Sequence, residues 1–172
     1  MRRWPACLGP ACMAPVYLAA VLALAPVAHA EISCERLEEL VGFARSGFSG
    51  IVIDTPGTPR SELPTSYKLM PADTCFVSLF AEPVYLCERV VSSEAPALGD
   101  YEGLLSALRS CLPGWTGEVE TGDGSGGDMI PMRTLYLAEP GPGSSLEWTL
   151  ALDRHQMPGN ADFHVLLGLS VR

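Results

Sequence analysis

Two aspartate–histidine pairs near the C-terminus are the residues best suited to chemistry. Asp153-x-His155 and Asp162-x-His164 flank the turn-like segment 157–160 (MPGN). Imidazole and carboxylate groups bind zinc, and they act as general bases when positioned against a substrate. Such pairs at strand ends are more commonly solvated, and His164 falls on the polar side of its strand, as an ordinary surface histidine does. We therefore assign no catalytic, cofactor-binding or metal-binding residue.

A glycine-rich segment over 122–128 (GDGSGGD) superficially resembles the Gly-Asp-Ser-Gly-Gly of trypsin-like proteases. An extra glycine separates Asp123 from Ser125, and His155 and His164 follow the serine instead of preceding it. No Lys-Ser or Lys-Thr follows the glycines, as a phosphate-binding loop requires. Two aspartates are too few for a calcium loop. The composition is typical of a flexible hairpin tip.

The first thirty residues have the order of a secretory signal peptide. Arg2 and Arg3 precede an apolar run over 14–28, which ends in Ala28-His29-Ala30. This arrangement predicts cleavage after Ala30 and a single mature domain over 31–172. The uncharged run is short for a membrane span. We therefore expect a periplasmic or secreted protein that does not insert into a membrane after cleavage.

The mature chain is strongly acidic. The full sequence carries a formal charge of −9, and Arg2 and Arg3 are the only charged residues of 1–30, so cleavage leaves −11. Negative charge of this size argues against nucleic-acid and anionic-lipid partners. It keeps a protein soluble and favours a cationic protein partner.

Four cysteines remain after cleavage: Cys34, Cys75, Cys87 and Cys111. An even number in a secreted chain predicts disulfides, and the wide spacing disfavours a metal or redox site. From Cys87 a strand advances about 13 Å and a helix ending at Cys111 retraces about 18 Å. We therefore prefer Cys87–Cys111 with Cys34–Cys75. The alternative is a cross-strand Cys75–Cys87 bridge around a hairpin at 81–83.

Hydrophobic periodicity predicts an α+β fold, with an antiparallel sheet and two helices on one of its faces. Alternation is clearest at Leu146–Leu152 and Phe163–Val171, and indicates strands with one buried face. We expect helices over 35–46, capped by Ser33 and stopped at Gly47, and from about Gly99 to 112, and strands over 51–53, 67–70, 75–80, 84–91, 115–121, 130–138, 146–153 and 163–171. The stretches 54–66, 122–128 and 139–145 read as loops.

A short motif follows both predicted helices. Gly47-Phe-Ser-Gly-Ile-Val52 and Gly114-Trp-Thr-Gly-Glu-Val119 share glycine, aromatic, hydroxyl, glycine and valine in the same order. A glycine that ends a helix accounts for the first position. The repeat favours an internal helix-plus-strands duplication, against coincidence over six residues.

The cysteines and core aromatics also form a pattern across most of the mature chain. Cys34 precedes a helix, and Ala72-x-x-Cys75, Tyr85-x-Cys87, Tyr101-x-x-Leu104 and Cys111-Leu-Pro-Gly-Trp115 follow. The pattern resembles a group of short secreted proteobacterial proteins. The resemblance implies a bacterial periplasmic setting and carries over no activity.

Two classes of function remain open from the sequence. The first is a non-enzymatic periplasmic binding module, such as an inhibitor, an immunity-type protein or an envelope accessory factor. The second is a small hydrolase or metal-dependent enzyme that uses the 153–164 hairpin. Convergence of Asp153, His155, Asp162 and His164 in one concave site would favour the second class.

Overall fold

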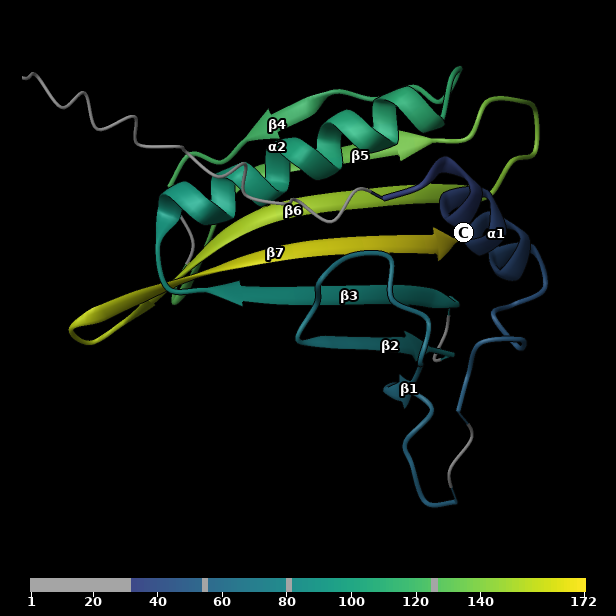
Figure 1. Ribbon diagram of the computed structural model, residues 1–172, viewed down its shortest axis with the longest axis horizontal. Coiled ribbons are helices and arrows are strands. Elements are labelled where there is room, and N and C mark those ends of the chain that lie inside the picture. The colour runs from purple at the N-terminus through teal and green to yellow at the C-terminus, as the bar shows by residue number, and fades with distance from the viewer. Residues whose placement is uncertain (1–31, 54–55, 80–81, 125–126) are drawn as a thin grey trace, which may run out of the picture.

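The computed structural model describes residues 32–53, 56–79, 82–124 and 127–172 (Figure 1). The predicted signal peptide at 1–30, Ala81 of the predicted hairpin and Ser125 of the glycine-rich segment lie outside the described residues.

The described residues form two helices and one antiparallel sheet of seven strands, which confirms the α+β class. The elements follow the order α1 (Cys34–Arg45), β1 (Leu63–Pro64), β2 (Thr74–Ser78), β3 (Val84–Val91), α2 (Glu94–Cys111), β4 (Val119–Thr121), β5 (Met129–Ala138), β6 (Leu146–Met157) and β7 (Asn160–Val171). The strands are arranged β1-β2-β3-β7-β6-β5-β4. Each helix therefore precedes a run of strands that starts at one edge of the sheet and ends at its centre.

The proposed duplication stays a prediction, with which this strand order is compatible. The two glycines that open the repeated motif, Gly47 and Gly114, both have left-handed backbones, with φ of +67° and +94°. Glycine adopts this conformation without the steric penalty of a Cβ atom. Both helices are thus followed by a glycine in the left-handed conformation.

Helix α1 begins and ends where its sequence predicts. The Ser33 side chain caps it by accepting a hydrogen bond from the Arg36 amide at 3.3 Å. At the other end the Gly47 amide donates to the Ala44 carbonyl at 2.9 Å. The predicted apolar stripe is buried along its whole length, at Leu37, Leu40, Val41 and Ala44.

Helix α2 is longer than the sequence suggested. It begins at Glu94, not at about Gly99, so Pro96 and Gly99 both lie within it. Proline is tolerated there because the first amides of a helix have no intrahelical partner to lose. Eighteen helical residues span about 27 Å, half as much again as we expected from twelve.

The longer helix explains why the preferred disulfide pairing is wrong. The structure joins Cys34 to Cys111 and Cys75 to Cys87, with Cα–Cα distances of 4.9 Å and 4.1 Å. Helix α2 passes the level of Cys87 and reaches the start of α1. Cys75 and Cys87 are direct partners in the register of β2 and β3. The cross-strand alternative was therefore right.

The strand predictions fail near β1 and ahead of β4. Residues 51–53 and 115–118 are not strands, and Val52 and Thr116 form only isolated bridges. Leu63–Pro64 pairs with β2, although 54–66 was expected to be a loop, and residues 67–70 are not a strand. Tyrosine hydroxyl groups hold this segment instead. The Tyr85 hydroxyl donates to the Tyr67 carbonyl at 3.0 Å, and the Tyr67 hydroxyl lies 2.9 Å from the Glu39 carboxylate. Burial and Glu39 together raise the pKa of Tyr67 to about 12.

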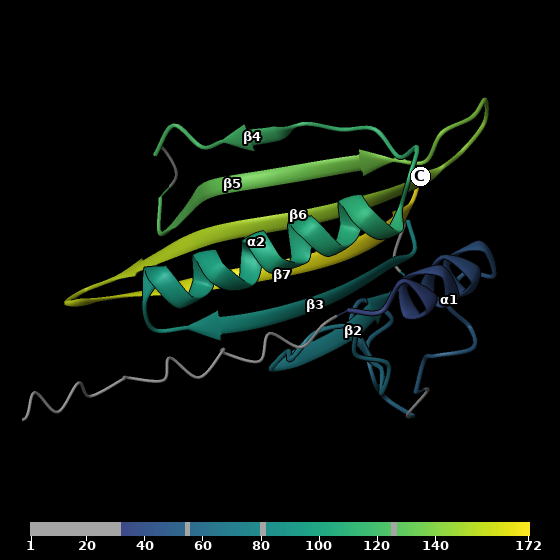
Figure 2. The ribbon, with the colours of Figure 1, turned by 45° about the horizontal axis from the view of Figure 1, so that its top comes forward.

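One side of the sheet, called here the inner face, packs against the helices. Figures 1 and 2 show α2 lying across β6 and β7, with α1 near the end of β7. Odd-numbered residues of β3 and β7 and even-numbered residues of β6 lie on this face, and Trp148, Leu150, Leu167 and Leu169 are fully buried there. The clean alternation in β6 and β7 is confirmed.

Within the described ranges, neither helix is long and apolar enough to cross a membrane.

Candidate functional site: the open face of the sheet

The opposite side of the central strands, called here the outer face, lies open. It consists of the even-numbered residues of β3 and β7, the odd-numbered residues of β6, and Met129, Pro131, Thr134, Tyr136 and Ala138 of β5. Partners opposite one another across an antiparallel ladder share a face, so the register alone fixes this membership. A shift in the β5 register after Pro131 keeps Thr134 and Tyr136 on the same face as Met129.

Several large apolar side chains are exposed on this outer face. Five large hydrophobic residues are exposed in the part of the chain that the structure describes, by 41% to 46% of their surface. Four of them belong to the outer face: Val90, Met129, Tyr136 and Met157. The fifth, Ile53, lies beyond β1 at the edge of the sheet. Several exposed apolar side chains on one face of a sheet are a common feature of interaction surfaces.

Small residues occupy the centre of the outer face. Gly168 pairs with Leu86 on one side and with Thr149 on the other, and Thr149 pairs with Tyr136. A Cβ atom at Gly168 would lie 3.3 Å from a Leu86 methyl group, so Leu86 already leans over this position. In this row, two small residues, Gly168 and Thr149, therefore lie between the large side chains of Leu86 and Tyr136.

The predicted aspartate–histidine pairs meet at one end of this face. Asp153 pairs with His164 and His155 with Asp162 across the β6–β7 hairpin. The two imidazole rings lie 5.6 Å apart in an edge-to-face arrangement. Gly159, with a φ of +84°, closes the turn between these strands. The sequence therefore placed these four residues together correctly.

His164 differs from the solvated histidine that we expected. Its side chain is only 14% exposed, and its Nδ1 atom lies 2.6 Å from the Glu88 carboxylate of β3. The alternation pattern placed His164 off the core correctly. It gave no sign of Glu88, which lies far away in the sequence and reaches His164 only because β3 pairs with β7. Cross-strand pairing of this kind is absent from local sequence patterns.

Asp153 is the most perturbed acid of the cluster. Burial beside the hairpin raises the pKa of its carboxyl group, and the neighbouring His164 partly offsets this shift. Within the described residues, no three histidine, cysteine or acidic side chains are placed to hold one metal ion. The cluster can bind cations electrostatically and can change its charge with pH.

Acidic side chains give the outer face a negative charge along the strands. Glu88, Asp153 and Asp162 lie at the hairpin end, Glu147 lies at the other end, and Glu120 of β4 lies beside Thr134. No lysine or arginine occupies an outer-face position of β3, β5, β6 or β7 in the described residues. Arg172, just past the end of β7, pairs with Glu147.

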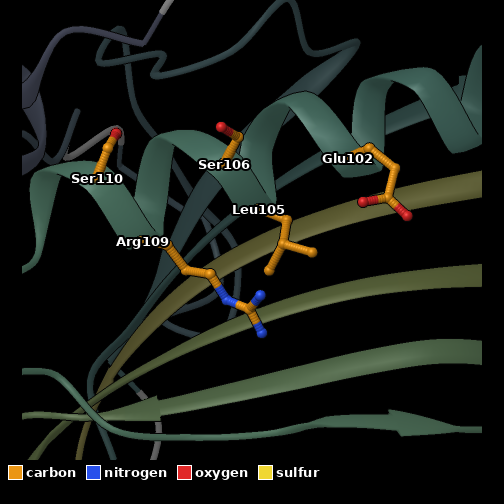
Figure 3. Close-up of a pocket in the computed structure, with 5 residues that line it drawn as sticks. All are labelled: Glu102, Leu105, Ser106, Arg109 and Ser110. Carbon is orange, nitrogen blue, oxygen red and sulfur yellow. The ribbon is translucent and has the colours of Figure 1, made fainter.

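A hollow lies beside α2, on the helix side of the sheet. It has a volume of about 480 Å³ and is lined by Glu102, Leu105, Ser106, Arg109 and Ser110. Figure 3 shows Leu105 and Arg109 pointing toward the strands and both serines pointing away from them. Glu102 is held by Arg133 of β5. Arg109 is thus the cation available to a ligand here, and the hollow suits a small anionic group.

No protein-family model matches this chain, and neither a curated protein nor a solved structure matches it either. The resemblance to short secreted proteobacterial proteins stays a prediction. The outer face described above therefore carries the functional inference.

Proposed function

We propose that the mature chain is a non-enzymatic binding module of the periplasm, which acts by holding a protein partner on the outer face of its sheet. The observation that carries this proposal is that Val90, Met129, Tyr136 and Met157 are all exposed on one open face. Exposed apolar groups lose contact with water when a partner covers them, which favours binding. Two disulfides are in keeping with an oxidising compartment.

The test compares three versions of the mature protein as bait in periplasmic extract. The wild-type chain is set beside Met129→Ser/Tyr136→Ser and beside the control Ile53→Ser, which removes an equally exposed residue away from this face. We expect one band that is retained by wild type and Ile53→Ser and lost with the double variant. Identical retention by all three would overturn the proposal, provided that their thermal midpoints agree.

The alternative is a small hydrolase or a metal-dependent enzyme at the 153–164 hairpin. The close contact of His164 with Glu88, beside the half-buried Asp153, is the observation in its favour. A carboxylate-held imidazole can serve as a general base. Against this, the cluster lies on an open strand surface and carries acids rather than a nucleophile.

The double variant His155→Ala/His164→Ala separates the two functions. For a binding module we expect it to rescue a deletion strain, with a loss of stability of about 1 kcal/mol from the broken contact with Glu88. An enzyme would lose function outright when its general base or metal ligand is removed. Loss of rescue with no more than this loss of stability would therefore favour the enzyme. A chelator that lowers the wild-type midpoint would indicate a bound metal.

A further inference from the structure

We propose that the partner held by the outer face presents apolar side chains bordered by lysine and arginine. This inference rests on the proposed function, because it names the chemistry of the partner at the same surface. It follows from two independent features of that face, its apolar relief and the sign of its charge.

The apolar relief accepts large side chains. Leu86 and Tyr136 stand at either side of the low positions Gly168 and Thr149, and all four lie in one row across β3, β7, β6 and β5. Leu86 covers Gly168, so a leucine or an aromatic ring of the partner would pack over Thr149, beside Leu86 and Tyr136. Buried anchors of this kind supply most of the binding energy in protein interfaces.

The negative charge of the outer face determines which residues of the partner can surround those apolar side chains. Glu88 lies directly beyond the apolar row and Asp153 one row further, Asp162 lies at the hairpin end, and Glu120 borders the β4 side. The imidazoles of His164 and His155 lie among these acids. A partner with basic residues around its apolar centre pairs with these carboxylates, whereas an acidic partner is repelled.

A second copy of this chain does not suit the surface. Two outer faces brought together would place the same carboxylates opposite one another, and the whole mature chain carries −11 by formal charge. Like charges in an interface oppose association and suppress wrong partners. A cationic partner is the occupant that satisfies both the apolar row and its acidic border.

The experiment uses synthetic peptides as probes against the mature, oxidised protein. One short peptide alternates leucine with lysine, a second alternates leucine with glutamate, and a third alternates serine with lysine. Isothermal titration gives their dissociation constants. We expect the leucine–lysine peptide to bind about tenfold or more tightly than either control. Its affinity should fall when NaCl is raised to about 0.5 M, because salt screens the carboxylates.

Variants of the protein test whether the peptide binds at the outer face. Asp162→Asn/Glu120→Gln removes two of the bordering charges, and Glu35→Gln/Glu38→Gln removes two exposed charges of α1 as a matched control. We expect the first to weaken the leucine–lysine peptide by about fivefold or more and the second by less than about twofold. Met129→Ser/Tyr136→Ser should weaken it about tenfold. Neither charge variant changes a core residue, so a difference in peptide affinity between them does not arise from unfolding.

Two results would overturn this inference. The first is equal affinity for the leucine–lysine and leucine–glutamate peptides, and the second is equal weakening by the two charge variants. If the bait of the preceding section still retains its partner through Met129 and Tyr136, only the cationic chemistry fails. If that retention is also unaffected by the serine variants, the binding function itself fails.

Discussion

The two faces of the central strands show opposite chemistry on the same backbone. On the inner face, Trp148, Leu150 and Leu167 are fully buried against the helices. On the outer face, Tyr136 and Val90 are 41% and 43% exposed, and their neighbours include Glu88 and Asp153. An ordinary solvated face would be polar throughout. The outer face has too much apolar surface for that, and we therefore assign the function to it.

The two sides of the sheet also differ in how they are fastened. The Cys75–Cys87 bridge lies on the inner face, and the Cys34–Cys111 bridge joins the helices that cover it. No disulfide in the described residues involves an outer-face position. The covalent and hydrophobic stabilisation therefore supports one side, and substitutions on the other can change function without unfolding the protein.

Removing the longer bridge should have the largest effect. Cys34 and Cys111 are separated by 77 residues and Cys75 and Cys87 by 12. A disulfide stabilises the fold by lowering the chain entropy of the unfolded state, and the effect grows with loop length. Removing it should therefore cost about 4.5 kcal/mol for Cys34→Ala/Cys111→Ala and about 3 kcal/mol for Cys75→Ala/Cys87→Ala. Urea unfolding of the two variants measures the difference. A larger cost for the short bridge would show that packing, not loop length, dominates.

Truncating one residue on each face compares the two directly. Trp148→Ala removes a fully buried side chain and should lower the free energy of unfolding by about 3–5 kcal/mol. Tyr136 lies on the opposite face of the sheet, and Tyr136→Ala should change the free energy of unfolding by no more than about 0.5 kcal/mol. Both values come from chemical denaturation at neutral pH. Comparable losses would mean that the outer face contributes to the core after all.

The edge strand beside the outer face depends on close backbone contact. A Cβ atom at Gly117 would meet the Tyr136 carbonyl oxygen of β5, a clash that only backbone movement can relieve. Gly117→Ala should therefore cost about 1–3 kcal/mol and increase amide exchange along β4. Gly103→Ala in α2 is the control, since nothing lies near its Cβ position and alanine favours a helix. A neutral Gly117→Ala would contradict the close approach of this segment to β5.

The acidic cluster should show the smallest effect, and one that depends on pH. Burial raises the pKa of Asp153 in the folded state above its ordinary value of 3.8. The folded protein therefore favours the protonated carboxyl group, and it loses stability as the pH rises through the raised pKa. Asp153→Asn should raise the thermal midpoint at pH 7, with a gain that fades below about pH 4. A gain that grows toward low pH would contradict this sign.

Local patterns predict most of the fold, and what they miss depends on long-range contacts. The strands over 84–91, 130–138 and 163–171 and the cap at Ser33 follow from alternation and from short-range hydrogen bonding. The start of α2 is harder to predict, because Pro96 and Gly99 are poor helix formers and only the first turn of a helix tolerates proline. That one error displaces Cys111 and leads to the wrong disulfide partners.

The candidate site was predicted in part for the same reason. Pairing of Asp153 with His164 follows from a hairpin, which local sequence reveals. Glu88 and Tyr136 belong to the site only because β3 and β5 flank that hairpin in the finished sheet. A sheet in which the two halves of the chain meet at β3 and β7 cannot be assembled from local periodicity. The outer-face surface therefore required the structure.

Photo-crosslinking in living cells tests the central claim most directly. A photoreactive phenylalanine analogue at Tyr136 would sample the outer face, and the same group at Ser106 would sample the hollow beside α2 (Figure 3). We predict an adduct with one periplasmic protein from position 136 and none from position 106. Adducts from position 106 alone would contradict the assignment of function to the outer face.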